Sequence, residues 1–196
     1  MSNTPLKFLG SFVRNPRQMG AVVPSSAALA KAMVRGLDVR DGQSVVELGP
    51  GTGAFTRAIL RGLPDGAEYL GIELNTRFVG HLRDRFPEAS FVEGCAQDAV
   101  RHHAEREMPA VRAVLCGLPF ASLPGAVQDG VVESLDELLA DGGEFRTFQY
   151  VHAYRMASAR RFRRRMDGVF GRGRRSPAVA MNVPPAYVLS WSRGSA

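Results

Sequence analysis

The chain has 196 residues, of which 45% are hydrophobic, and it carries a formal net charge of +6. This size and composition favour one domain with a substantial core over a disordered segment. No run of about eighteen apolar residues occurs, so a membrane-spanning helix is not expected. The N-terminus lacks the apolar core and cleavage site of a signal peptide, and two cysteines make no disulfide framework. We therefore expect a cytoplasmic protein.

The positive charge is unevenly distributed along the chain. Residues 151–175 contain nine arginines and a single acid, Asp167, which gives this segment a local charge of +8 and leaves −2 for the other 171 residues. A concentrated positive segment is typical of proteins that meet a polyanionic surface, either nucleic acid or anionic lipid. A solvated helix face is the plainer alternative.

The first predicted element is a helix that begins at Thr4-Pro5, because threonine caps a helix and proline suits its first position. Pro16 ends this segment. One face of the helix is apolar and has basic neighbours; its apolar residues are Leu6, Phe8, Leu9, Phe12 and Val13. Such a face fits either shallow insertion at a membrane interface or docking on the protein's own domain. After a connector over Gly20–Ser26, Ser25 or Ser26 caps a second predicted helix, which Gly36 stops.

A short apolar strand over Ser44–Leu48 then runs into a glycine turn and a helix, in the stretch V-V-E-L-G-P-G-T-G-A-F-T. Glycines let the backbone turn tightly and approach a ligand, and the new helix offers unpaired N–H groups. Taken alone, this pattern also fits the G-x-G-x-x-A of dinucleotide sites. Glu47 favours another ligand, because a carboxylate there would repel a pyrophosphate but could face a cationic amino group. A second strand, within Tyr69–Asn75, ends in Glu73, which is placed to accept hydrogen bonds from ribose hydroxyls.

The remaining elements alternate between strand and helix. A helix around Val79 is followed by a strand over Ser90–Glu93, and a nearly continuous apolar strand over Val111–Leu115 leads into C-G-L-P-F. A helix over Gly125–Leu139, the pair Gly142-Gly143, a fifth strand up to Tyr150 and the arginine-rich helix follow. Two final strand-like runs flank N-V-P-P (Asn182–Pro185), and the last of them is Ala186–Trp191. This order predicts an α/β fold with a doubly wound, mainly parallel seven-stranded sheet and an antiparallel edge strand. His102 and His103 have no spaced Cys or His companions, so we expect no metal site.

The stretch E-L-G-P-G-T-G, followed by G-I-E-L-N, resembles motifs I and II of the class I S-adenosylmethionine (SAM) methyltransferases. The resemblance implies a Rossmann-like fold, SAM as cofactor and S-adenosylhomocysteine as product. Ligands of open α/β sheets lie beyond the carboxyl ends of the strands. The implied cofactor residues are Gly20, Glu47, Gly49, Gly51, Gly53, Glu73, Leu74, Cys95, Ala96 and Cys116, with the Cys95–Ala96 turn beside the adenine ring.

Three further stretches resemble the bacterial phospholipid N-methyltransferases, and the likeness covers nearly the whole chain. They are N-P-R-Q-M-G-A-V-V-P-S-S (Asn15–Ser26), G-L-P-F-A-S-L-P (Gly117–Pro124) and N-V-P-P-A-Y-V (Asn182–Val188). The resemblance implies stepwise methylation of phosphatidylethanolamine toward phosphatidylcholine, on the cytoplasmic membrane surface, with residues 1–36 as membrane-contacting helices and residues 37–196 as the methyltransferase domain. One departure is Cys95, where such enzymes often carry an acid. Relatives methylate ornithine lipids, so that substrate stays open.

C-G-L-P-F is also similar to the N-x-P-[FY] motif of amine-directed methyltransferases, with a glycine in place of the usual middle residue and no asparagine. Pro119 fixes the backbone, so the carbonyls of Gly117 and Leu118 are expected to orient the amine. Phe120 is predicted to supply an apolar wall. Tyr150, with His152 close behind, is a candidate to hydrogen-bond the lipid phosphate or amine, and either residue is otherwise structural. Arginines that include Arg155, Arg160 and Arg161 are predicted to meet phosphate headgroups.

Two other classes of function remain. The basic segment and the likeness to rRNA adenine dimethylases favour an rRNA adenine N6-methyltransferase, but aromatic residues do not alternate with the arginines as in a base-stacking platform. The chain also ends just after its last strand, so no appended nucleic-acid domain is expected. A membrane-binding protein with a lapsed site is disfavoured by the intact Glu47, glycines and Glu73. We expect a monomer that binds an anionic membrane surface and a phospholipid, and no stable nucleic acid.

Overall fold

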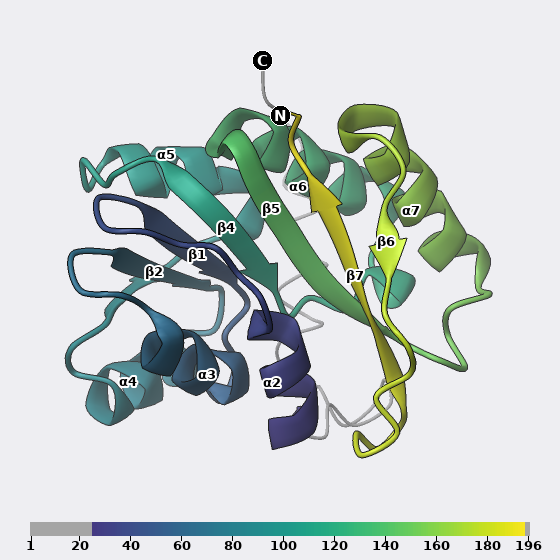
Figure 1. Ribbon diagram of the computed structural model, residues 1–196, viewed down its shortest axis with the longest axis horizontal. Coiled ribbons are helices and arrows are strands. Elements are labelled where there is room, and N and C mark those ends of the chain that lie inside the picture. The colour runs from purple at the N-terminus through teal and green to yellow at the C-terminus, as the bar shows by residue number, and fades with distance from the viewer. Residues whose placement is uncertain (1–24, 195–196) are drawn as a thin grey trace.

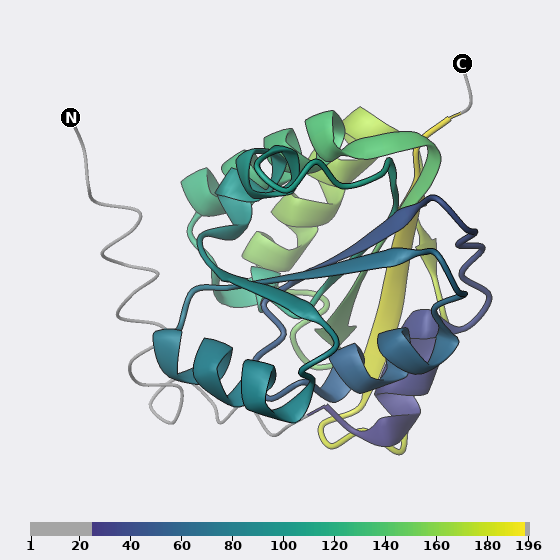
Figure 2. The same cartoon turned by 90° about the vertical axis from the view of Figure 1, so that its left-hand side faces the viewer.

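The computed structural model describes residues 25–194, which form a sheet covered by helices on both faces. Figure 2 shows the sheet in the middle, with α2 (Ala27–Val34), α3 (Ala54–Gly62) and α4 (Thr76–Arg85) along one face. The opposite face carries α5 (Ala99–Ala104), α6 (Gly125–Leu138) and α7 (Ala157–Phe170). The molecule is therefore a three-layer α/β/α domain.

The sheet has seven strands in the order β3-β2-β1-β4-β5-β7-β6 (Figure 1). Their bounds are β1 (Ser44–Leu48), β2 (Glu68–Glu73), β3 (Ser90–Glu93), β4 (Val111–Cys116), β5 (Leu139–Tyr150), β6 (Arg174–Arg175) and β7 (Ala186–Ser192). The first five are parallel, whereas β7 pairs antiparallel with β5 and carries the two-residue β6 on its outer side. The predicted fold class is confirmed. The strand order reverses between β1 and β4, which places a ligand crevice at their carboxyl ends.

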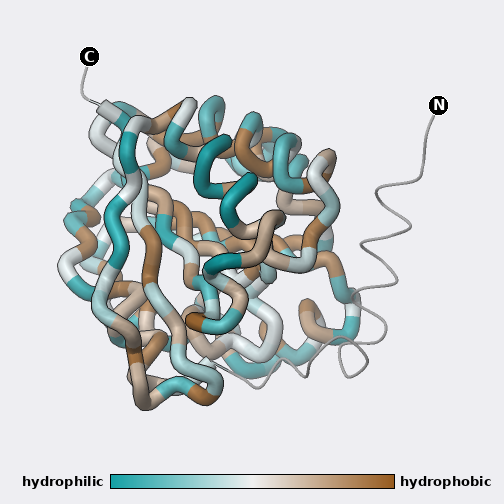
Figure 3. The backbone as a smooth tube through the Cα atoms, turned by 90° about the vertical axis from the view of Figure 1, so that its right-hand side faces the viewer, coloured by the Kyte–Doolittle hydropathy of each residue, from teal (hydrophilic) through white to brown (hydrophobic). Residues whose placement is uncertain are grey.

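Apolar side chains fill both faces of the sheet, as the near-continuous apolar strands predict. Val46 and Leu48 of β1 face the core under α5, α6 and α7, whereas Val45 faces the core under α2, α3 and α4. Figure 3 shows the hydrophobic colour gathered on the inner segments. The α2 helix begins where Ser26 Oγ accepts a hydrogen bond from the backbone N–H of Leu29 (3.2 Å), and Asn75 caps α4 in the same way.

The fifth strand starts earlier than the sequence predicts. It begins at Leu139 and runs through Gly142-Gly143, and its register against β4 shifts between Val111 and Ala113. The physical reason is a bulge over residues 140–143, in which Gly142 adopts a φ of +71°. The pair Gly142-Gly143, which is expected from the sequence to precede the fifth strand, is thus part of that strand.

Some of the predicted functional residues lie outside the described residues. They are the membrane-face residues Leu6, Phe8, Leu9 and Phe12, and the cofactor candidate Gly20. Between residues 25 and 194, no helix has the length and apolar character needed to cross a bilayer.

Candidate functional site at the carboxyl ends of the parallel strands

The glycine turn after β1 has three glycines with left-handed backbone: Gly49 (φ +70°), Gly51 (+58°) and Gly53 (+81°). Two of them are hemmed in by neighbours. A Cβ on Gly49 would lie 2.9 Å from Leu118 Cδ2, and one on Gly53 would lie 2.6 Å from Phe86 Cε2. A Cβ on Gly51 would meet no atom of residues 25–194 within 4 Å. Gly51 therefore fronts open space, where a ligand can approach the backbone.

Glu73, at the end of β2, reaches back to this turn. Its Oε2 accepts a hydrogen bond from the backbone N–H of Gly51 (2.9 Å), and its Oε1 accepts one from the N–H of Asn75 (2.9 Å). The side chain is largely buried, and burial raises the pKa of this carboxyl above its ordinary value in spite of the two hydrogen bonds. The predicted meeting of Glu73 with the glycine turn is therefore found, and its contact with a ribose stays a prediction.

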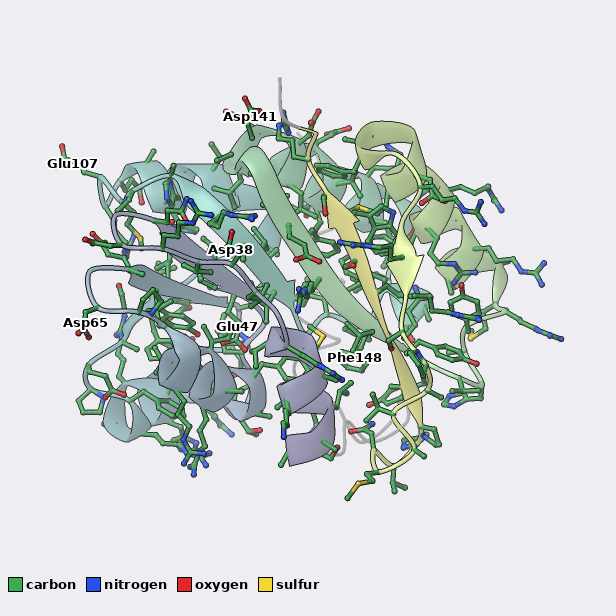
Figure 4. The ribbon with its side chains drawn as sticks, viewed as in Figure 1. Asp38, Glu47, Asp65, Glu107, Asp141 and Phe148 are labelled. Atoms are coloured by element: carbon green, nitrogen blue, oxygen red, sulfur yellow. The ribbon has the colours of Figure 1, made fainter. Side chains whose placement is uncertain are left out.

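Glu47 is fully buried rather than open to the crevice (Figure 4). Its Oε2 accepts hydrogen bonds from Tyr69 Oη (2.6 Å) and Thr56 Oγ1 (2.7 Å), and its Oε1 has no partner among residues 25–194. Burial raises the pKa of Glu47 from 4.5 to about 7. The sequence gives no sign of the two hydroxyl partners, because they lie nine and twenty-two positions away. A contact between Glu47 and an amino group stays a prediction.

The turn after β3 closes another side of the crevice. Cys95 and Ala96 are both buried, and the Cys95 thiol lies 3.6 Å from Gln97 Oε1. Burial raises the pKa of Cys95, so this thiol stays protonated. Methyltransferases of the family that the sequence resembles often carry an acid at this position. Leu74 is partly buried against the core.

The loop after β4 packs directly on the glycine turn. The N–H of Gly117 donates to the carbonyl of Leu48 (2.8 Å), and a Cβ on Gly117 would lie 2.6 Å from the carbonyl oxygen of Gly49. This contact explains the glycine that departs from the N-x-P-[FY] pattern. The preceding Cys116 is buried, which raises its pKa to about 12, so it is not a nucleophile.

Pro119 forms the centre of an inverse γ-turn, with φ −82° and ψ 72°. The N–H of Phe120 donates to the carbonyl of Leu118 (3.0 Å) across this turn. The carbonyl of Gly117 receives no backbone or side-chain hydrogen bond from the described part of the chain. Of the two carbonyls predicted to orient the amine, that of Leu118 already accepts one hydrogen bond. That of Gly117 accepts none from residues 25–194.

Phe120 is a correction to the sequence prediction of an apolar wall. Its ring is 1% exposed and stacks on Phe162 of α7 at 3.8 Å between centroids, with Phe145 against its edge. The ring is drawn into the core because α7 covers the short 3₁₀ turn Phe120–Ser122.

Tyr150 ends β5 and is half-buried. Its ring stacks on His152 at 5.6 Å between centroids and packs edge-on against Phe148 at 5.4 Å (Phe148 is labelled in Figure 4). Burial raises the pKa of Tyr150, so the phenol stays neutral and able to donate a hydrogen bond.

The three predicted headgroup arginines separate into two groups. Arg155 and Arg160 are exposed and line an open pocket beside α7, which is hydrophilic along much of its length in Figure 3. Arg161 is a correction, because its guanidinium is held by Asp129 Oδ2 (2.5 Å) and Gln128 Oε1 (3.2 Å) of α6. It ties α7 to α6 and does not line this pocket.

The comparisons with known proteins concern the sequence and the fold. No protein-family model matches the chain. The ornithine lipid N-methyltransferase of Singulisphaera acidiphila is 31% identical over 141 residues, which are 70% of this chain and 73% of that protein. The ribosomal RNA small subunit methyltransferase A of Thermosynechococcus vestitus is 32% identical over 84 residues, 42% of this chain and 31% of that protein. A SAM-dependent O-methyltransferase structure from Thermotoga maritima has a TM-score of 0.65 at 14% identity and matches 94% of this chain and 71% of that one.

Proposed function

We propose that this chain, which belongs to the class I SAM-dependent methyltransferases in the family of the ornithine lipid N-methyltransferase, methylates the primary amine of a membrane aminolipid. The candidate acceptors are phosphatidylethanolamine, which the sequence motifs favour, and ornithine lipid, which the name of the relative favours. The observation that carries the proposal is the Gly117 carbonyl, which lies in a loop packed on the cofactor turn and receives no hydrogen bond from residues 25–194.

SAM is the cofactor, and the residues around the crevice fit it. Gly51 fronts open space, and Glu73 keeps unused lone pairs beside it after accepting two backbone hydrogen bonds. The buried Oε1 of Glu47, which has no partner among residues 25–194, is a further acceptor two residues before the same turn. We expect Gly51, Glu73 and the Cys95–Ala96 turn to hold the nucleoside of SAM. We expect Glu47 to interact with the cationic amino group of SAM.

SAM supplies a methyl group on a positively charged sulfonium. The protein's share of the work is to align a neutral amine with that methyl group, and alignment of this kind contributes several kcal/mol to the barrier reduction (about 7–11 in favourable cases). The Gly117 carbonyl accepts a hydrogen bond from an amine N–H and so points the nitrogen lone pair away from itself. Pro119 holds this carbonyl in place, and the neutral Tyr150 phenol donates to the acceptor's anionic group or amine.

An rRNA adenine is the second candidate acceptor, favoured by the similarity to the ribosomal RNA methyltransferases. That similarity covers about a third of the length of those proteins, whereas the similarity to the lipid enzyme covers 73% of it. The arginine-rich α7 and the apolar face predicted over residues 6–13 also support work at an anionic membrane surface, where each basic residue contributes on the order of 1 kcal/mol.

The test is an incubation of the protein with methyl-labelled SAM and three acceptors in parallel, followed by separation of the products. The acceptors are vesicles that contain phosphatidylethanolamine, vesicles that contain ornithine lipid, and structured ribosomal RNA. We expect label in the headgroup of one or both lipids. Label in RNA and in neither lipid contradicts the proposal.

A further inference from the structure

An open pocket of about 420 Å³ lies beyond the end of β5, between α7 and the β6–β7 edge of the sheet. Its volume is in the range of small-molecule sites. Seven residues line it, and six of them are arginines or tyrosines: Val151, Tyr154, Arg155, Arg160, Arg163, Arg175 and Tyr187. They come from three separate segments of the chain, so no local sequence pattern reveals the pocket.

Two of the guanidinium groups are held in place on the tyrosine rings. The Arg163 guanidinium lies 3.7 Å from the centroid of Tyr154, and that of Arg175 lies 4.6 Å from the centroid of Tyr187. The two rings meet edge-to-face at 5.1 Å. Arg163 Nη1 also donates to Gln149 Oε1 (2.6 Å) and to the carbonyl of Tyr154 (2.9 Å). The site is therefore assembled before any ligand arrives.

The positive charge of this pocket has no counterion within the described part of the chain. Among the nine arginines of residues 151–175, Arg161, Arg165 and Arg174 form ion pairs with carboxylates. The four arginines of the pocket form none within residues 25–194. Four like charges that converge with no carboxylate in ion-pair contact repel one another, and an anion between them removes that repulsion.

A buried side chain behind the pocket helps to hold it in place. Gln149 is 3% exposed and does not line the pocket, and its Oε1 accepts a hydrogen bond from Arg163 Nη1. This contact fixes Arg163 from the core side.

We infer that this Arg–Tyr pocket binds the phosphate of a phospholipid headgroup. Guanidinium groups match phosphate oxygens in charge and in planar hydrogen-bond geometry. The pocket begins at Val151, which directly follows the last residue of β5, and so lies at the carboxyl end of the same parallel strands as the proposed active site. The inference deepens the proposed function for a phospholipid acceptor, since ornithine lipid has no phosphate, and rests on it for the choice of a lipid rather than a free phosphate.

The experiment compares two double variants that remove the same charge from the same segment. Arg155→Gln with Arg160→Gln changes the pocket at two exposed side chains that make no hydrogen bond within residues 25–194, so the fold is retained. Arg164→Gln with Arg172→Gln is the matched control, because both residues are exposed and neither lines the pocket. Sedimentation with phosphatidylcholine vesicles that contain phosphatidylglycerol measures affinity, with glycerol 3-phosphate as a soluble competitor.

We expect the pocket variant to lose about tenfold more vesicle affinity than the control, because it loses directed contacts as well as net charge. Excess glycerol 3-phosphate is expected to weaken the binding of the wild type and the control, but not the residual binding of the pocket variant. Equal losses in the two variants overturn the inference, as does a selective loss of binding to structured RNA. Competition that leaves the wild type unaffected also overturns it.

The inference and the proposed function fail in different ways. If no lipid acquires a methyl group while the pocket variant still loses vesicle affinity selectively, the phosphate site stands and the proposed reaction fails. If lipid is methylated and the two variants bind vesicles equally, the reaction stands and the phosphate site is wrong.

Discussion

The side chain of Asn182 accepts a hydrogen bond from the backbone N–H of Ser26, with 2.9 Å between Oδ1 and N, across 156 positions of the chain. Its Nδ2 donates to the carbonyl of Pro184 (2.7 Å), and the residue is 2% exposed. The N-V-P-P stretch is thereby fastened to the start of α2. This contact joins two of the stretches that mark the family likeness and gives both a structural role.

We expect Asn182→Ala to lower the free energy of unfolding by about 1–3 kcal/mol, because it leaves a part-buried N–H without its acceptor. Urea unfolding of the two proteins measures the difference. Asn75→Ala is a suitable control, since Asn75 bonds an exposed N–H near its own position, and its loss is expected to cost about 1 kcal/mol. Equal stability of wild type and Asn182→Ala would show that the contact is incidental.

The cofactor turn is tested by Gly51→Asn. Asparagine tolerates the left-handed φ of this position, and its side chain would enter the open space that Gly51 fronts. Gly42→Asn is the matched control. Gly42 has a φ of +71° and no atom of residues 25–194 near its Cβ position, and it lies just before β1, at the amino end of the strand and away from the glycine turn. We expect calorimetric titration to show SAM affinity lost in Gly51→Asn and retained in Gly42→Asn. Equal affinities would remove Gly51 from the site.

The buried carboxyl of Glu47 predicts a pH dependence of stability. Its pKa is about 7 in the folded protein against an ordinary value of 4.5, so the folded state keeps a proton that the unfolded chain has released between these pH values. The contribution to stability is therefore complete below pH 4.5 and is lost as the pH rises to about 7. Glu47→Gln keeps an acceptor for Tyr69 and Thr56 but has no proton to lose.

We accordingly expect the stability of Glu47→Gln relative to wild type to rise by roughly 3 kcal/mol between pH 4.5 and 7. Urea unfolding at a series of pH values measures this difference. A constant difference across that range contradicts the raised pKa. If the Glu47 carboxylate also binds the amino group of SAM, Glu47→Gln is expected to bind SAM more weakly than the wild type above pH 7.

The geometry of the Gly117 carbonyl is tested by Pro119→Ala. Alanine allows the backbone to leave the inverse γ-turn at Pro119, which follows the Gly117–Leu118 segment packed on Gly49. We expect kcat to fall by about tenfold or more with SAM affinity nearly unchanged, because orientation is expressed in the transition state. If Pro119→Ala has the kcat of the wild type, Pro119 has only a structural role in the turn.

The sequence predicts the strands, their order of appearance and the two acidic positions, because apolar runs and glycine turns are local signals. Glu73 meets the glycine turn as expected, since both follow neighbouring parallel strands. The roles of Phe120 and Arg161 could not be assigned from the sequence, because each depends on a contact with a distant residue. Phe120 stacks on Phe162 of α7, and Arg161 pairs with Asp129 of α6. The sequence indicates only part of the Arg–Tyr pocket. Arg155 and Arg160 belong to the charged segment that the sequence reveals, whereas Arg175 and Tyr187 are brought beside them by the pairing of β6 with β7.

The most direct test of the account is mass spectrometry of the lipids after incubation with SAM that carries a deuterated methyl group. Vesicles with phosphatidylethanolamine and ornithine lipid are offered to the wild type and to Gly51→Asn, with structured ribosomal RNA in the same mixture. The account predicts deuterated methyl groups on the headgroup nitrogen of an aminolipid with the wild type, and none with the variant. Deuterium on adenine, with both lipids unchanged, would contradict it.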